Sequence, residues 1–187
     1  MTILGIDPGS RKTGYAILKV EQGTCAALDY GTIILTGIKS MPEKLFKLYH
    51  ELDKLFAKFQ VDCVAVEAGF YGKNAQSAYK LGYARSAAVL AAALREIDVV
   101  EYSPRKIKQA VTGNGNASKS QVKYMVRNLL RFDDLKNIRE DEADACAVAI
   151  CHSQNGGKSE RTYRNWKEFV AQNNHLVFHG GSGVAAR

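Results

Sequence analysis

The pattern of apolar and polar residues predicts three strands at the start of the chain. Residues 2–7 form a short apolar run that ends at Asp7, and turn-forming residues follow it at Pro8–Ser10. Residues 13–20 and 25–35 are rich in β-branched and aromatic residues, and the turn Gln22–Gly23 separates them. We therefore expect an antiparallel meander over this part of the chain.

Helical periodicity begins after the meander. Apolar residues spaced by three and four predict a helix over residues 42–59. Buried strands are expected over 61–67 and 97–102, with an Ala-rich helix at 74–96 between them. Three more helices are expected over 104–111, 119–132 and 139–153. This order predicts an α/β fold with a five-stranded mixed sheet, three antiparallel strands followed by parallel ones, flanked by helices.

Composition adds domain limits and a class of partner. We expect one domain over residues 1–153 and a partly flexible tail over 154–187, where glycine becomes frequent. The net charge of +7 favours a polyanionic partner. The four cysteines form no Cys-x-x-Cys pair, which is typical of free thiols in a reducing compartment. No signal peptide or membrane-spanning run is evident, so we expect a cytoplasmic protein without a membrane partner.

Four acidic residues stand where such a fold would bring them together. Asp7 and Glu67 each end a predicted strand, and ligand sites in open α/β sheets gather at strand ends. Asp141 and Asp144 lie three residues apart at the start of a predicted helix and so share one helix face. Taken singly, the helix pair could be acids favoured by the helix dipole, and Glu67 could be a turn residue.

Four gathered carboxylates would repel one another unless a cation lay between them. Mg²⁺ prefers carboxylate and water oxygens and takes further ligands from phosphate. A metal pair about 3.5–4 Å apart can activate a water and stabilise the leaving 3′ oxygen of a phosphodiester. We therefore predict a metal-dependent nuclease with two Mg²⁺ ions per active site, with Mn²⁺ as an alternative.

Basic residues that could hold DNA gather between 105 and 131. Ser118 and Gln121 fit a capping box, which makes Lys119 the first helical residue, beside a loop of Gly and Asn. A lysine at a helix start is well placed to hold a phosphate. The alternative is a solvated basic helix face, which we favour for Arg127 and Arg131.

Two aromatic residues and one misleading motif complete the candidates. Phe70 and Tyr71 follow Glu67 closely and could stack on an unpaired base, or could be buried under their loop. The segment Gly113–Ser120 nearly matches the phosphate-binding P-loop. It has Ser118 where the second glycine belongs, and a predicted helix precedes it instead of a strand, so we reject nucleotide hydrolysis.

Several segments, taken in order, resemble the motifs of the RuvC family of bacterial Holliday-junction resolvases. They are Gly5–Ser10, Thr13–Tyr15, Lys73–Ala78, Leu81–Arg85, Val111–Gly115, Lys119–Val122 and Asp141–Ala145. The resemblance runs from about residue 2 to residue 153. It implies a ribonuclease-H-like fold, a homodimer, and Mg²⁺-dependent paired nicking of four-way DNA junctions in recombination and repair. It also suggests a RuvA–RuvB branch-migration complex as a partner.

The same resemblance implies roles for individual residues. It carries Asp7, Glu67, Asp141 and Asp144 over as catalytic metal ligands. Phe70 matches the aromatic residue that enters the junction centre, and Lys108 and Lys119 match basic residues that contact DNA near the cut. We add Tyr71, Lys73 and Arg105, which neighbour these residues, as candidate DNA contacts. The chain departs from the family pattern at Tyr83 and Ser86, on the long Ala-rich helix.

Two other functions share some of these features, and the Ala-rich helix has two interpretations. A sugar kinase or actin-like ATPase also has a strand-end Asp-x-Gly, but it needs two lobes, and this chain supplies one. A junction-binding module without catalysis would share the basic residues. In the helix, Ala78, Gly82 and Ala92 could let a second subunit approach, or could simply pack on the sheet.

Overall fold

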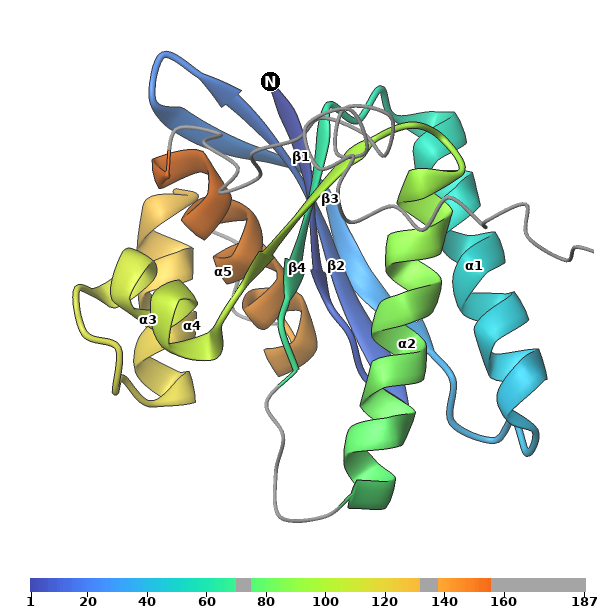
Figure 1. Cartoon of the computed structure of the whole chain (residues 1–187). Helices are drawn as coiled ribbons and strands as arrows, with labels where there is room; N and C mark the ends of the chain where they lie inside the picture. Colours follow the sequence, from blue (N-terminus) through green and yellow to red (C-terminus); the bar gives the residue numbers. More distant parts are fainter. Residues whose placement is uncertain (70–74, 132–137, 156–187) are drawn as a thin grey trace, which may run out of the picture. The chain divides into compact units, whose positions relative to one another are not determined.

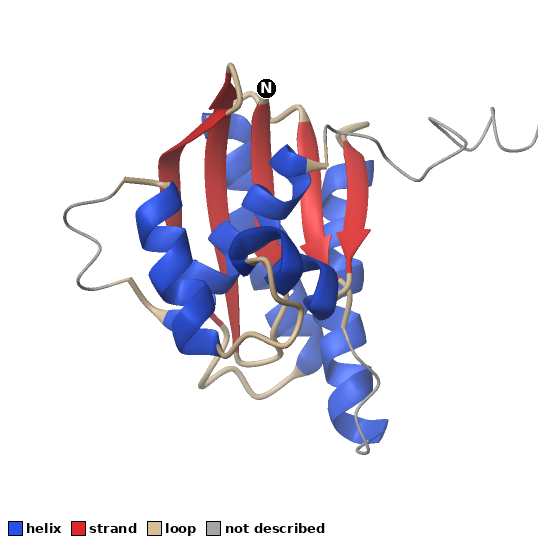
Figure 2. Ribbon diagram, turned by 90° about the vertical axis from the view of Figure 1, so that its left-hand side faces the viewer, coloured by secondary structure: helices blue, strands red, loops and turns tan. Residues whose placement is uncertain are grey.

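The computed structural model describes residues 1–69, 75–131 and 138–155. The structure confirms the expected five-stranded mixed sheet, whose strand order is β3-β2-β1-β4-β5. The strands are β1 (Thr2–Asp7), β2 (Lys12–Glu21), β3 (Thr24–Ile34), β4 (Cys63–Glu67) and β5 (Asp98–Tyr102). The first three strands pair antiparallel, whereas β1, β4 and β5 pair parallel. Figure 2 shows the strands side by side, with helices in front of the sheet and behind it.

Helices cover both faces of the sheet. The helices are α1 (Met41–Lys58), α2 (Ala75–Ala93), α3 (Pro104–Thr112), α4 (Lys119–Leu129) and α5 (Glu140–Gln154). Figure 1 shows α1 and α2 on one side of the sheet and α3, α4 and α5 on the other. Each side has its own apolar core, one built with Leu48 and Leu52 of α1, the other with Val122 of α4 and Val148 of α5.

The apolar residues before Asp7 do not alternate with polar ones, because they form β1 at the centre of the sheet. Ile3, Leu4 and Ile6 are all fully buried, because helices cover β1 on both faces. In the first half of the edge strand β3, exposed and partly buried residues alternate, which is typical of a strand with one solvated face. Local signals also act as expected at helix starts, since Ser40 caps α1 and Ser103 caps α3 through hydrogen bonds to backbone N–H groups.

Several element boundaries differ from the prediction by a few residues. The helix expected over 119–132 ends at Leu129, for example. Two further differences lie at the fourth strand and the long helix. The fourth strand begins at Cys63 and not at residue 61, and just before it the Asp62 carboxylate accepts a hydrogen bond from the Thr2 N–H at 2.6 Å. The long helix ends at Ala93, and Glu96 adopts a φ of 57° in the turn that leads to β5. Both differences occur where side-chain and turn geometry, rather than hydrophobic periodicity, sets the end of an element.

Two other expectations concern membrane spans and the domain edge. None of the described helices is both long and apolar enough to cross a membrane. The expected domain edge near residue 154 lies at the end of α5, and the tail beyond it lies outside the described residues.

Candidate active site

Two of the four predicted acids lie at the ends of neighbouring strands. Asp7 is the last residue of β1 and Glu67 the last residue of β4. These strands pair in parallel with Ile6 opposite Val66, so the two carboxylates meet at the same edge of the sheet. Both side chains are half-buried. This strand-end pair confirms where the sequence placed the two acids.

The turn after Asp7 has little freedom. The hydroxyl of the fully buried Thr13 accepts a hydrogen bond from the Gly9 N–H at 3.3 Å and donates one to the Gly9 carbonyl at 3.2 Å. A side chain at Gly9 would overlap the backbone carbonyl of Lys12. Thr13 therefore holds the turn, and with it Asp7, in one position. The sequence carried no signal for this role, because an isolated threonine in a strand is ordinary.

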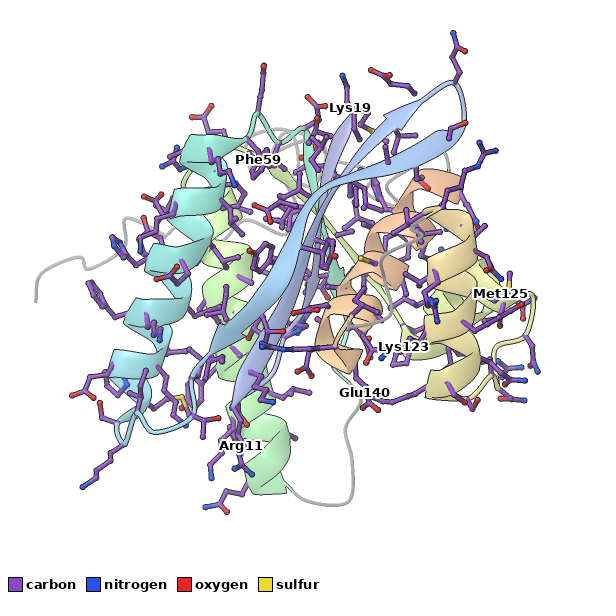
Figure 3. The ribbon with its side chains drawn as sticks, turned by 180° about the vertical axis from the view of Figure 1, so that it is seen from behind. Arg11, Lys19, Phe59, Lys123, Met125 and Glu140 are labelled. Carbon is purple, nitrogen blue, oxygen red and sulfur yellow. The ribbon has the colours of Figure 1, made fainter. Side chains whose placement is uncertain are left out.

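The other two acids reach this edge because α5 lies directly on the sheet. A Cβ atom at Gly14 would overlap the backbone carbonyl oxygen of Asp141, and one at Gly5 would overlap that of Ala145. Glycines on β1 and β2 thus let the backbone of α5 approach the strands closely. Figure 3 shows Glu140, at the start of α5, at the same end of the molecule as Arg11, which follows β1.

The pKa of Asp7 is raised by burial and by the charges of neighbouring acids. Burial, followed by the charges of Glu67 and Asp144, raises the pKa of Asp7 to about 8, and Asp141 adds a smaller effect in the same direction. Burial and Asp144 raise the pKa of Glu67 to about 7. Asp7, Glu67 and Asp144 also line one cavity, whereas Asp141 does not line it and contributes only a weak charge effect at Asp7.

Two predicted basic residues lie beside the acids. Lys119 begins α4 behind the expected capping box, and its Nζ donates a hydrogen bond to the Asp144 carboxylate at 3.0 Å. This hydrogen bond raises the pKa of Lys119. Lys108 and Lys119 line a cavity of about 110 Å³ together with Asp7, Glu67 and Asp144. Two lysines therefore line the same cavity as three of the acids.

Other candidates lie elsewhere. Arg105 is exposed on α3 and packs against Gly115, and it does not line the cavity around the acids. Phe70, Tyr71 and Lys73 lie outside the described residues. The departures Tyr83 and Ser86 are exposed on α2, so neither disturbs its packing on the sheet.

The loop that resembled a P-loop joins two helices, α3 and α4, and its N–H groups are already used. The Asn114 N–H donates to the Thr112 hydroxyl at 3.2 Å, and the Gly115 N–H donates to the Gln109 side-chain oxygen at 2.9 Å. The Asn116 N–H donates to the Asn114 side chain at 2.9 Å. Because these donors are occupied, the loop does not offer the ring of free N–H groups with which a P-loop holds phosphate.

The acids offer the type of ligand that a divalent metal prefers, but their side chains are not arranged around a single ion. Carboxylate oxygens are ligands that hard cations prefer, and the raised pKa values of Asp7 and Glu67 show that negative charge in this place lacks compensation. Within the described ranges, no three acidic, His or Cys side chains are arranged to hold one ion. A metal would therefore require small side-chain movements, including release of Asp144 by Lys119.

Glu142, one of three acids in the first turn of α5, has a structural role that the capping pattern could have revealed. Glu142 is 9% exposed, accepts a hydrogen bond from the Arg139 N–H at 2.8 Å, and accepts another from the Thr32 hydroxyl at 3.3 Å. It therefore ties the start of α5 to β3. Sequence reasoning also missed Arg85, which lines a second cavity with Asp7 and Glu67.

Comparisons with known proteins agree with this arrangement. A family model described as crossover junction endodeoxyribonuclease RuvC matches residues 3–152. The crossover junction endodeoxyribonuclease RuvC of Geobacter sp. (strain M21) is 46% identical over 159 residues, which cover 85% of this chain and 96% of that protein. The protein of the same description from Chloroherpeton thalassium is 38% identical over 185 residues, covering 95% of this chain and 99% of its own length.

The fold has a close counterpart among solved structures. The structure of T. thermophilus RuvC in complex with Holliday junction substrate superposes with a TM-score of 0.78 and 29% identity, over 83% of this chain and 94% of that chain. This likeness confirms the ribonuclease-H-like fold that the sequence motifs implied.

Proposed function

The chain belongs to the RuvC family of crossover junction endodeoxyribonucleases, and we propose that Asp7, Glu67, Asp141 and Asp144 form its catalytic centre. Its function is Holliday-junction resolution. The observation that supports this centre most strongly is that Asp7 and Glu67, at the carboxyl ends of β1 and β4, share a cavity with Asp144, from the start of α5. We propose that each active site nicks one strand of a four-way DNA junction, so that a homodimer makes paired symmetric nicks.

RuvC nucleases are metal-dependent, and we propose Mg²⁺ as the metal, with two ions per site. Asp7 and Glu67, which line both cavities at this edge of the sheet, would hold the metal together with Asp141 and Asp144. When bound, such a pair activates a water and stabilises the leaving oxygen. In the reaction, the water oxygen bonds to phosphorus and the bond to the 3′ oxygen breaks, which leaves a 5′ phosphate and a 3′ hydroxyl.

We propose that Lys119 offsets negative charge on the scissile phosphate. Its ammonium group pairs with Asp144, and its side chain is 64% exposed, so it can turn toward a ligand. Lys119 would move from Asp144 to neutralise a phosphate oxygen of the bound DNA. Lys108, in the same cavity, would add positive charge beside the cut. Phe70, Tyr71, Lys73 and Arg105 remain candidate DNA contacts on the strength of their sequence positions.

We propose that the homodimer forms through the outer face of α2. Tyr79, Tyr83, Leu90 and Leu94 are all exposed along and just beyond this helix, with spacings that place them on one side. The small residues that suggested an interface do not lie there, because Ala78 and Gly82 line a cavity and Ala92 is fully buried in the core. A two-fold dimer would match the symmetry of a four-way junction.

The remaining partner and location stay predictions. A cytoplasmic site of action and cooperation with a RuvA–RuvB branch-migration complex follow from the proposed role in recombination and repair.

A junction-cleavage assay tests the proposed centre. We expect the purified protein to nick two opposing strands of a labelled four-way junction with Mg²⁺, or with Mn²⁺, and to make no product with EDTA. Asp7→Asn should bind the junction but lose at least about 100-fold in cleavage rate, because a metal ligand is lost. Asp53→Asn, which alters an exposed acid paired with Arg95, is the matched control. Equal cleavage by both variants would remove Asp7 from the mechanism.

A further inference from the structure

A second and larger cavity adjoins the acids on the side of α2. It measures about 300 Å³ and is lined by Asp7, Glu67 and Arg85, together with Pro8, Gly69, Ala78, Leu81, Gly82 and Pro104. Asp7, Glu67 and Pro104 also line the smaller cavity that contains Lys108 and Lys119. The two carboxylates at the strand ends therefore stand between two hollows, one on the α4 side and one on the α2 side.

The wall formed by α2 leaves this cavity open. A Cβ atom added at Gly82 would meet no other atom within 4 Å, and Ala78 contributes a single methyl group one turn earlier. Among the described residues that line the cavity, Arg85 is the one cation. The negative charge of Asp7 and Glu67 would repel a phosphate group here unless a cation on the same wall offset it.

Arg85 is held in place and has unused donors. Its Nη2 group forms an ion pair with Glu101 on β5, which anchors the guanidinium from one side. Its Nε is buried and has no hydrogen-bond partner among the described residues. A guanidinium presents five N–H donors in a fixed plane, and a buried donor without a partner is costly. The side chain is 38% exposed, so a ligand can reach the remaining donors.

We infer that Arg85 binds a phosphate of the cleaved DNA strand that neighbours the scissile phosphate, in the cavity between α2 and the strand-end acids. The inference rests on the proposed function, since it places the scissile phosphate at the four acids. A strand that crosses the acids would meet Lys119 and Lys108 on one side and Arg85 on the other. Arg85 would thus keep the DNA strand from sliding along its axis past the acids, which neither lysine can do alone.

The test compares Arg85→Gln with Arg95→Gln. Arg95 is a well-matched control, because it also pairs with one acid, Asp53, and its side chain is 39% exposed. We expect Arg85→Gln to weaken binding of a four-way junction about 10- to 100-fold, as for loss of a charge-assisted hydrogen bond. The slope of log affinity against log salt should decrease by about one. Arg95→Gln should bind as the unmodified protein does.

A second measurement separates phosphate binding from a structural role. Junctions are made with one neutral methylphosphonate at each phosphate flanking the cut, in turn. At the contacted position, the neutral group should weaken binding by the unmodified protein and cost Arg85→Gln nothing further. Glu101→Gln, which removes the ion pair but keeps Arg85, should retain binding to within about 3-fold, as expected for a half-exposed ion pair. Thermal unfolding is followed for every variant.

The outcomes are distinct. Failure of the unmodified protein to cut any junction would contradict the proposed function itself. Normal cutting by the unmodified protein, with Arg85→Gln binding like Arg95→Gln, would overturn only the role of Arg85. Arg85→Gln and Glu101→Gln could lose equal affinity for the junction, or the methylphosphonate could weaken binding equally with and without Arg85. Either result would mean that Arg85 acts only through its ion pair with Glu101.

Discussion

Asp7 illustrates at the scale of one residue how burial and neighbouring charge create a reactive site. Its carboxylate ends a strand with a buried centre and shares a cavity with Glu67 and Asp144, and burial and these charges raise its pKa to about 8. Lys119 offsets part of this repulsion but is already hydrogen bonded to Asp144. The lysines therefore offset only part of the negative charge, and protons and divalent cations would compete for the same carboxylate oxygens.

This competition predicts a pH dependence of stability. Folding raises the pKa of Asp7 from 3.8 to about 8 and that of Glu67 from 4.5 to about 7. The native state thus binds more protons than the unfolded state between these limits, and the metal-free protein should lose stability as the pH rises from about 4 to about 8. The double variant Asp7→Asn, Glu67→Gln should lose this slope in urea unfolding.

Mg²⁺ should reverse the trend, because ion binding requires the deprotonated acids and releases their protons. Stabilisation by Mg²⁺ should therefore increase with pH through the same range in the unmodified protein, and should be weak in the double variant. A metal-free protein whose stability stayed constant from pH 4 to pH 8 would contradict the proposed coupling.

At the scale of elements, the decisive contact is that of α5 with β1 and β2. Gly5 and Gly14 leave room for the carbonyl groups of Ala145 and Asp141, and this close approach brings two helical acids to two strand-end acids. The tie from Glu142 to Thr32 and the cap at Arg139 hold the first turn of α5 in the same place. The placement of the acids proposed as the catalytic centre is thus a consequence of helix–sheet packing.

Gly14→Ala tests this contact. The added methyl group would overlap the Asp141 carbonyl, so α5 must move away from β2. We expect a loss of about 1–3 kcal/mol in the free energy of unfolding from overpacking. Cleavage should fall by about 100-fold, as for a catalytic group displaced by about 1 Å.

Urea unfolding and single-turnover cleavage measure these two effects of Gly14→Ala. For stability, Gly82→Ala is the matched change, since its methyl group would enter open space and alanine favours a helix. If Gly14→Ala kept both the stability and the cleavage rate of the unmodified protein, close packing of α5 would not position the acids.

At the scale of the whole molecule, the two sides of the sheet have different tasks. The side with α3, α4 and α5 supplies two acids and the lysines beside them, whereas the side with α1 and α2 supplies Arg85 and an exposed apolar face (Figure 1). The net charge of +7 suits a partner with a phosphate backbone. An exposed apolar face suits a second copy of the chain, because its burial would stabilise a dimer.

The double variant Tyr83→Glu, Leu90→Glu tests the dimer. The unmodified protein should sediment at about twice the chain mass of 20.6 kDa, and the variant should sediment as a monomer, because charge is costly in an apolar interface. The variant should also produce single nicks in place of paired ones. Phe46→Glu, at a residue of α1 that is 70% exposed, is the matched control. A variant that remained dimeric would place the interface elsewhere.

The sequence by itself determined most elements and the four acids. Strand and helix periods follow from local backbone geometry, so β1, α1, α4 and α5 could be located from hydrophobic spacing and caps. Asp7 and Glu67 could be found because an acid that closes an apolar run must lie at a strand end. Lys119 could be found because Ser118 and Gln121 mark a helix start.

Only the tertiary structure decided which side chains face one another. The Ala-rich helix α2 has apolar residues around most of its circumference, so no stripe in the sequence could show that Ala78 and Gly82 face a cavity while Tyr83 and Leu90 face outward. Arg85 could not be paired with Glu101 or placed beside Asp7, because contacts between distant segments depend on how α2 is rotated on the sheet. Periodicity is a property of a few consecutive residues, whereas a binding site is a property of the packing between elements.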